Sequence, residues 1–182
     1  MATVHPGIDE RLRSFLEDQP VFFVATAPLA ADGRVNVSPK GGRGTLVVAD
    51  PHTVAYLDLT ASGAETIAHL RENGRITVMA CAFEGRPQIV RLHGRGRVVG
   101  PADQDYPSWV ARFPAHPGVR AVIVVAVDRV ADSCGFAVPL MEYVGDRSVL
   151  DDVNARKDDA ELARYRALKN RASIDGLPAV DW

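Results

Sequence analysis

The chain has 182 residues, of which 47% are hydrophobic and 24% charged, and it carries a formal charge of −2 at neutral pH. This length accommodates one sizeable hydrophobic core, so we expect residues 1–182 to form a single domain, and the composition excludes a disordered or collagen-like protein. The small net charge gives no electrostatic reason for nucleic-acid binding, so any anion site must be local.

Two further protein classes are disfavoured by the sequence. No apolar run approaches the roughly 20 residues that span a bilayer, and the first residues lack the apolar stretch and cleavage site of a signal peptide. We therefore expect a cytoplasmic protein without a membrane partner. Cys81 and Cys134 are predicted to be free thiols, and the five histidines show no metal-ligand spacing, so no metal site is expected.

The first elements are a helix and a pair of strands. Residues 8–19 have apolar side chains at helical spacing, and residues 21–27 and 34–40 read as strands joined by a turn that ends in Asp32-Gly33. We expect the two strands to pair. The second strand alternates, with its polar side chains on one face (Arg34, Asn36, Ser38 and Lys40) and its apolar ones on the other (Val35, Val37 and Pro39). The polar face is either a solvent face or a binding face.

Residues 53–83 read as a strand, a Gly-containing turn, a helix and a strand. Ser62 and Glu65 have the spacing of a capping box, which predicts the start of the helix. Gly63 leaves backbone N–H groups uncovered there, and with the helix dipole these groups favour a phosphate, which the hydroxyls of Thr60, Ser62 and Thr66 would help to bind. The alternative is an ordinary capped helix. A carboxylate at Glu65 would repel a phosphate unless it is held in the cap.

The second half of the chain contains two long strands and a polar helical region. In residues 88–99, alternation places four basic residues on one face, either as a solvated edge or as a binding face (Arg91, His93, Arg95 and Arg97). Residues 118–130 form the most strongly β stretch and should be central, whereas a helical extension from about residue 146 should lie outside the sheet. Trp182, at the turn-like end, reads as exposed or disordered.

Taken together, these elements predict a mainly β protein with helical attachments. Six or seven strands are joined by short turns, one helix is inserted between two of them, and helices lie at the ends. This order favours a closed or partly closed antiparallel barrel over a parallel α/β sheet, which would need more crossover helices.

Several stretches resemble the pyridoxamine 5′-phosphate oxidase-like family of FMN-binding split β-barrels, in its poorly characterised bacterial branch. They cover nearly the whole chain and lie at residues 22–42, 54–85, 89–99, 133–143 and 173–178. The resemblance implies an antiparallel split β-barrel and a homodimer that binds two FMN molecules at its interface. Each phosphate would be held by one protomer, and each flavin ring would be covered by both.

The resemblance also implies which residues contact FMN. Ser38 and Lys40, with Arg43 as a further candidate, fall at phosphate positions, together with the turn residues Ser62, Gly63, Glu65 and Thr66. Further cofactor contacts fall on the strands beside the flavin, at Tyr56, Leu57, Asp58, Gln88 and Arg91. Arg91 is the candidate for the basic group near the flavin ring, with His93 a weaker one. No catalytic residue is assigned.

Two departures from the family pattern affect the expected function. Ala64 stands where this branch usually has Asn, and the chain ends SIDGLPAVDW instead of the Arg-Leu-x-Pro ending of the oxidases that act on pyridoxine phosphate. The resemblance therefore implies an FMN-dependent oxidoreductase that exchanges a hydride or electrons between a small organic substrate and a nicotinamide or oxygen, but not a pyridoxine phosphate oxidase. The alternatives are a flavin-binding stress or storage protein without turnover, or the same barrel with a deazaflavin or haem.

Overall fold

The structure, a computed structural model, describes residues 3–182. Its strands are β1 (Thr3–His5), β2 (Val21–Thr26), β3 (Asn36–Gly41), β4 (Leu46–Asp50), β5 (Thr53–Leu59), β6 (Arg75–Cys81), β7 (Ile89–Val99) and β8 (Val119–Ser133). Its helices are α1 (Glu10–Asp18), α2 (Glu65–Asn73), α3 (Tyr106–Val110), α4 (Val149–Ala155) and α5 (Asp159–Lys169).

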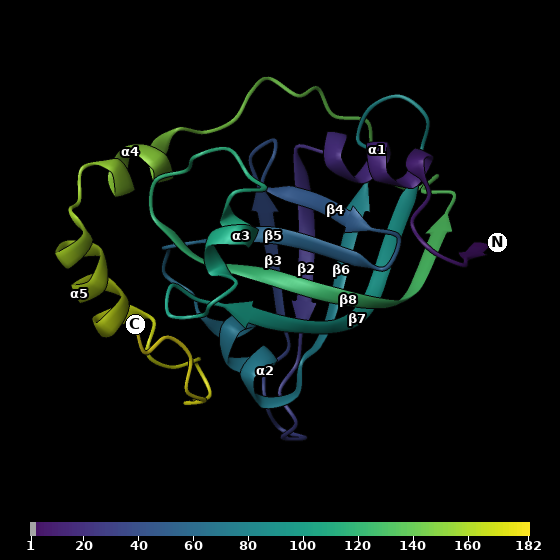
Figure 1. Cartoon of the computed structure of the whole chain (residues 1–182). Coiled ribbons are helices and arrows are strands. Elements are labelled where there is room, and N and C mark those ends of the chain that lie inside the picture. Colours follow the sequence, from purple (N-terminus) through teal and green to yellow (C-terminus); the bar gives the residue numbers. More distant parts are fainter. Residues whose placement is uncertain (1–2) are drawn as a thin grey trace.

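In the described residues, all eight strands belong to one antiparallel sheet that curls into a half-barrel (Figure 1). The strand order is β3-β2-β6-β7-β8-β5-β4, and β1 pairs with β8 outside this path. The predicted fold class, a mainly β split barrel with helical attachments, is confirmed. The expected central position of residues 118–130 is also confirmed, because β8 lies between β7 and β5.

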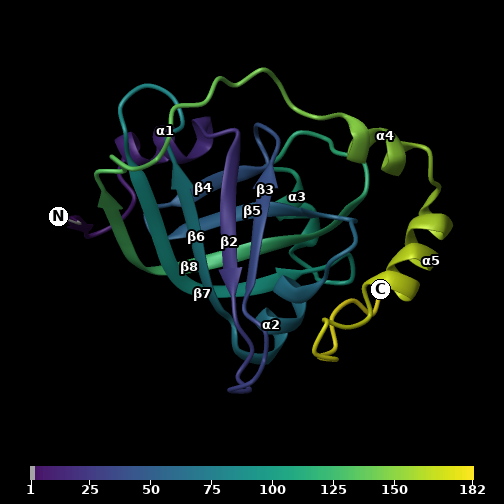
Figure 2. The same ribbon diagram turned by 180° about the vertical axis from the view of Figure 1, so that it is seen from behind.

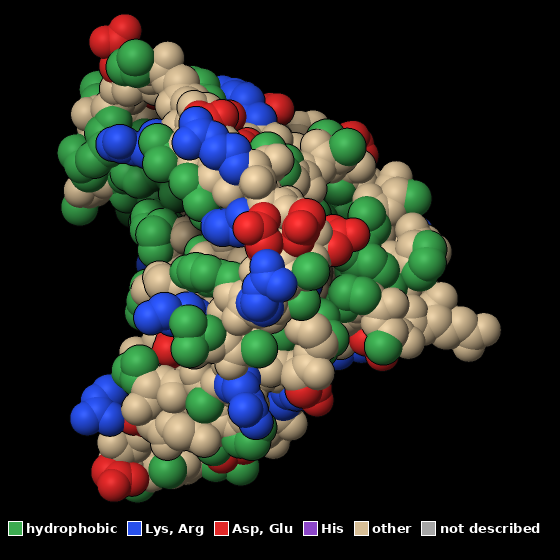
Figure 3. All heavy atoms as spheres, turned by 90° about the vertical axis from the view of Figure 1, so that its left-hand side faces the viewer, with side chains coloured by type: hydrophobic (Ala, Val, Ile, Leu, Met, Phe, Trp, Pro, Cys, Tyr) green, Lys and Arg blue, Asp and Glu red, His purple; other side chains and the backbone are tan. Residues whose placement is uncertain are grey.

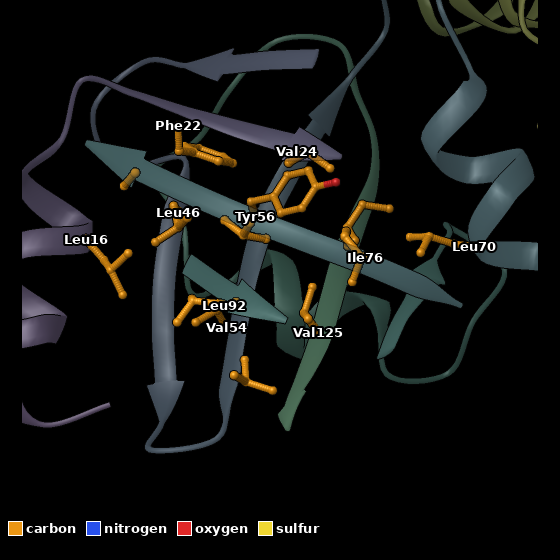
Figure 4. Packing of buried hydrophobic residues seen from close by; sticks show 14 of the residues in the cluster. Leu16, Phe22, Val24, Leu46, Val54, Tyr56, Leu70, Ile76, Leu92 and Val125 are labelled. Atoms are coloured by element: carbon orange, nitrogen blue, oxygen red, sulfur yellow. The ribbon is translucent and has the colours of Figure 1, made fainter. Parts of the chain in front are cut away.

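The core fills the concave side of the sheet. Alternate residues of β2 point inward, and Phe22 packs edge-on against the ring of Tyr56 with 5.4 Å between ring centroids (Figure 4). Leu12 and Leu16 of α1 close one end of this core and are almost fully buried. Burying such large apolar side chains supplies most of the folding free energy, so the half-barrel is a packed body and not an open channel.

β2 and β3 pair as predicted. The structure also shows which face of β3 points to solvent, a question that the sequence left open. Ser38 and Lys40 are only half-exposed and lie on the inner side, whereas Val35 and Val37 are 69% and 65% exposed. The interpretation of the polar residues as a solvent face is therefore wrong. The edge strand β3 turns its polar side chains toward the mouth of the half-barrel.

The predicted capping box at the start of α2 is wrong. The N-cap residue is Ala64, which has no side-chain hydrogen bond to the helix, so Ser62 lies two positions too early to act as the cap. The helix ends where Gly74 adopts a positive φ of 71° and its N–H bonds to the carbonyl of Leu70. The first turn of α2 consequently keeps its N–H groups free of a capping side chain.

The C-terminal part of the chain crosses the molecule and then packs against it. Residues 134–148 form an extended strap that runs over the end of the sheet to α4 (Figure 2). The expected helical region is divided into α4 and α5, because Asp158 starts α5 with a capping box. Seen from the side on which α4 and α5 lie, the surface carries Lys and Arg as well as Asp and Glu side chains, so neither sign of charge covers the face (Figure 3).

The end of the chain is more tightly packed than its sequence indicates. Trp182 is half-buried, its indole Nε1 donates a hydrogen bond of 3.0 Å to the carbonyl of Arg120, and the guanidinium of Arg71 lies over its ring. The expectation of an exposed or disordered Trp182 is therefore wrong. Within residues 3–182, no helix is long and apolar enough to span a bilayer.

Candidate functional site

A pocket of about 270 Å³ lies between β3, the end of β5 and the start of α2. It is lined by residues of these elements and by one residue of β8: Ser38, Pro39, Lys40, Asp58, Leu59, Ala61, Ser62, Gly63, Ala64, Glu65, Thr66 and Arg120. The structure thus brings together seven of the twelve residues predicted to contact a cofactor: Ser38, Lys40, Asp58, Ser62, Gly63, Glu65 and Thr66.

The base of the pocket is a buried cluster of three charges. Asp58 accepts a hydrogen bond of 2.7 Å from Nε of Arg120, and Nζ of Lys40 lies 3.4 Å from its other carboxylate oxygen. Burial alone would raise the pKa of Asp58, but the charges of Arg120 and Lys40 and their hydrogen bonds outweigh it, so the pKa is lowered. Two cations share one carboxylate, and Lys40, the more exposed cation, is left with capacity to bind an anion.

A second, neutral hydrogen-bond network connects the pocket to the interior. Ser38 donates to Oδ1 of Asn36 at 2.8 Å, and Nδ2 of Asn36 donates to the hydroxyls of Thr26 and Thr66, each at 3.1 Å. Thr26 in turn lies 2.9 Å from Nδ1 of His69, which is almost fully buried. Burial lowers the pKa of His69, so its ring is held neutral more readily than in water. This network fixes the side chains on the β3 wall of the pocket.

The opposite wall is the turn before α2 and the first turn of the helix. Because Ala64 provides no side-chain cap, the N–H groups at the start of α2 and the positive end of its dipole face the pocket. Gly63 lies next to the carboxylate of Glu65, since a Cβ at this position would lie 2.7 Å from one of its oxygens. The wall therefore combines a set of backbone donors with one acidic side chain.

Five predicted site residues lie outside this pocket. Tyr56 is fully buried in the core with no partner for its hydroxyl within the described residues, and burial raises the pKa of this hydroxyl. Leu57 packs in a small cluster on the opposite face of β5. Leu57 adjoins Asp58 and alternates to the other face of β5, whereas Tyr56 shares the face of Asp58 but is packed within the main core.

The other three lie on different parts of the surface. Arg43 lines a second pocket of about 530 Å³, where its guanidinium stacks on the ring of Tyr143. Gln88 donates to Asp132, and Arg91 donates to Ser133, each at 3.3 Å; Arg91 lies on the outer face of β7, because its neighbours Val90 and Leu92 point into the core. Their role in cofactor binding stays a prediction.

Arg120 is the pocket residue that sequence reasoning missed. It lies within the strongly apolar stretch of β8, where its side chain is only 3% exposed. Its Nη1 also donates to the carbonyl of Gly63 at 2.9 Å, so it connects the ion cluster to the turn. A single charge within the apolar stretch at residues 119–127 was the available signal, because a buried charge needs a buried partner.

The half-barrel agrees with the comparisons to known proteins. Residues 8–134 match the family described as pyridoxamine 5′-phosphate oxidase, and the chain belongs to this family. A curated relative, the pyridoxamine 5′-phosphate oxidase family protein ustO of Aspergillus flavus, is 39% identical over 197 residues, which cover 99% of this chain and 78% of the relative.

Solved structures share the fold at lower identity. HupZ of Group A Streptococcus superposes with a TM-score of 0.51 at 21% identity, over 68% of this chain and 91% of its own. An FAD-binding protein of Mycobacterium smegmatis gives 0.51 at 16% identity, and an FAD-binding protein of Mesorhizobium loti gives 0.50 at 14%, each over 72% of this chain and 96% of its own. At these identities the likeness concerns the fold.

Proposed function

We propose that the protein binds FMN, with the phosphate in the pocket between Lys40 and the start of α2. The observation that carries this proposal is an uncapped helix N-terminus facing a lysine across a pocket lined by hydroxyl groups. Backbone N–H groups, a helix dipole and a cation together favour a compact dianion. The FAD-binding proteins that share the fold support a flavin as the ligand.

The residues that line the pocket fit a flavin phosphate, except that Glu65 carries a negative charge like the phosphate itself. Its carboxylate lies beside Gly63 in the same pocket and would repel a phosphate at close range. A carboxylate is also an acceptor, and the ribityl chain of a flavin carries hydroxyl donors next to its phosphate. We therefore assign Glu65 to the ribityl hydroxyls, and Lys40, Ser62 and Thr66 to the phosphate.

We further propose an oxidoreductase that works on a small organic substrate with a nicotinamide or oxygen as redox partner. A bound flavin supplies hydride or electron-pair transfer at its ring, and the protein contributes position and electrostatics. Arg91 is the candidate for the positive charge beside the ring. It faces outward from β7, so it would meet a flavin held at a contact between two protomers.

A homodimer is part of this proposal, and the outer face of β3 and β2 is its best-supported interface. Val35 and Val37 are largely exposed there, next to half-exposed Phe23 and Met79 on the paired strands. Exposed apolar patches of this kind mark interaction surfaces. The strongly apolar stretch of β8, by contrast, is mostly buried within its own protomer.

A pyridoxine phosphate oxidase is not the proposed activity, although the family carries that name. The segment that would supply the Arg-Leu-x-Pro ending is instead packed on the protein's own α5 and β8 through Trp182. With FMN bound, we expect turnover of pyridoxine 5′-phosphate well below about 1 per second, the low end for typical enzymes. A turnover rate at or above this value would show that pyridoxine 5′-phosphate is a substrate after all.

Titration of the cofactor-free protein tests the proposal directly. FMN, riboflavin, FAD, a deazaflavin and haem are added in turn, and binding is followed by quenching of flavin or deazaflavin fluorescence and by visible absorption. We expect one FMN per chain, bound at least about tenfold more tightly than riboflavin, since charge-assisted hydrogen bonds contribute about 1.5 to 3 kcal/mol. Preferential binding of haem or deazaflavin, or no binding of any flavin, would overturn the proposal.

A further inference from the structure

The turn that forms one wall of the pocket is tied to the C-terminal helices by two buried amides. Nδ2 of Asn154, on α4, donates to the carbonyl of Thr60 at 3.2 Å, and Nδ2 of Asn170, just after α5, donates to the carbonyl of Ala61 at 2.9 Å. Both asparagines are almost fully buried. They lie outside residues 8–134, the part of the chain that matches the family.

These two contacts set the direction of the backbone donors of the turn. No cis peptide bond occurs in the described residues, and in a trans peptide the carbonyl and the following N–H point in opposite directions. Carbonyls drawn toward α4 and α5 therefore turn the N–H groups of Ala61 and Ser62 away from these helices. In the described chain, neither N–H group donates to another backbone group.

Packing alone does not account for amides at these positions. The Oδ1 atoms of Asn154 and Asn170 are buried and have no partner among the described residues, which costs stability. The fit is nevertheless specific: a Cβ on Gly118, whose φ is +72°, would lie 2.4 Å from Nδ2 of Asn154. The carbonyl of the same Gly118 accepts the N–H of Thr60.

The chain end provides a third tether on the same side. The indole of Trp182 donates to the backbone carbonyl of Arg120, whose guanidinium holds Asp58 and the carbonyl of Gly63. The ring of Trp182 also lies 3.1 Å from where a Cβ of Gly100 would be. Residues 154–182 thus hold the start of the turn directly and contact the backbone of Arg120, which holds its end.

We propose that Asn154 and Asn170 are positioning residues, which hold residues 60–63 in the conformation that presents backbone N–H groups to a phosphate. The segment 149–182 then contributes to the anion site by fixing the conformation of this turn. This inference rests on the proposed binding of a flavin phosphate for its ligand, but the conformation of the turn can be measured without any ligand.

The test compares Asn170→Ala and Asn154→Ala with Ser173→Ala in the full chain. Ser173 is a matched control, because it is buried in the same segment and bonds to Leu177 instead of the turn. Amide hydrogen exchange of the ligand-free proteins should be faster at Thr60, whose N–H donates to the carbonyl of Gly118, in both asparagine variants, while β8 stays protected and Ser173→Ala matches the wild type. Unchanged exchange in the turn would overturn the inference.

FMN and riboflavin titrations then test the ligand. Loss of one positioning hydrogen bond should weaken the affinity for FMN by about three- to tenfold and change the affinity for riboflavin by no more than about twofold. Equal losses for both flavins would overturn the assignment to the phosphate. If the wild type binds no FMN while exchange in the turn still rises in the asparagine variants, the proposed function fails and the positioning role is retained. The two failures are therefore distinguishable.

Discussion

At the scale of single residues, the pocket depends on Asp58 and Arg120, whose side chains are 1% and 3% exposed. A buried ion pair of this kind adds little net stability, but removing one partner leaves an uncompensated charge. If Arg120 were removed, Lys40, at 3.4 Å from Asp58, would replace only part of the interaction that Asp58 loses. The cluster therefore fixes the geometry of the pocket more than it stabilises the fold.

Arg120→Met should destabilise the protein by about 3 to 5 kcal/mol, measured by urea unfolding. The double variant Asp58→Leu/Arg120→Met should recover part of this loss, because it removes both charges. Arg97→Met is the control, since the pair of Arg97 and Asp105 is about half-exposed and should change stability by about 1 kcal/mol or less. A loss below about 1 kcal/mol for Arg120→Met would contradict the buried cluster.

His69 makes stability depend on pH in a predictable direction. Burial lowers its pKa, while the nearby carboxylates Glu72, Glu65 and Asp175 and its hydrogen bond at Thr26 limit the decrease. As the pH falls below about 6.5, the unfolded chain takes up a proton before the folded chain does. The stabilisation is complete above that value and decreases toward the lower folded pKa, by at most about 1.4 kcal/mol per pH unit.

Urea unfolding of the wild type and of His69→Gln at pH 7.5 and pH 5.5 measures this dependence. The wild type should lose more stability than the variant over this interval. The difference between the two proteins isolates His69 from the other histidines. An identical pH dependence in both would show that His69 does not titrate differently on folding.

At the scale of elements, β7 and β8 approach each other closely at a bulge. The register shifts between His93 and Gly94, and a Cβ on Gly94 would lie 2.0 Å from the carbonyl oxygen of Ala126. Neither backbone can move without breaking the longest strand pair of the sheet. Only glycine therefore fits at position 94, because the two strands approach each other too closely for a side chain.

Gly94→Ala should destabilise the protein by at least about 3 kcal/mol, or prevent folding, because overpacking a rigid site is costly. Gly85→Ala is the control: nothing lies within 4 Å of its Cβ, and its φ of +64° should cost only about 1 to 2 kcal/mol. Thermal unfolding followed by circular dichroism measures both. Equal losses for the two variants would contradict the close contact at the bulge.

The elements also show where sequence reasoning succeeded and where it failed. Strand alternation correctly placed Ser38 and Lys40 on one face, because this pattern depends on neighbouring residues, whereas the phosphate seat at the Gly-containing turn stays a prediction. The capping box failed since the helix starts at Ala64 and not at Ser62. Arg120, Asn154 and Asn170 reach the site through contacts 57 to 109 residues apart, which no local period can reveal.

At the scale of the whole molecule, the exposed apolar face of β3 predicts a homodimer. Sedimentation of the FMN-bound protein at micromolar concentration should give about twice 19.6 kDa. Val37→Lys should shift it toward the monomer, because an obligate interface of more than about 2,000 Å² does not tolerate an unpaired buried charge. Leu168→Lys, on exposed α5, should leave the mass unchanged. A monomer in the wild type would contradict this prediction.

The central claim is that the pocket between Lys40 and α2 holds the phosphate of a flavin, and one comparison tests it most directly. FMN and riboflavin are titrated into the wild type and into Lys40→Met, which keeps the apolar stem of the side chain but not its charge. FMN should bind about ten- to a hundredfold more weakly to the variant, with riboflavin nearly unchanged. Equal losses for FMN and riboflavin would contradict the claim and direct the search for the phosphate site to Arg43 and Arg91.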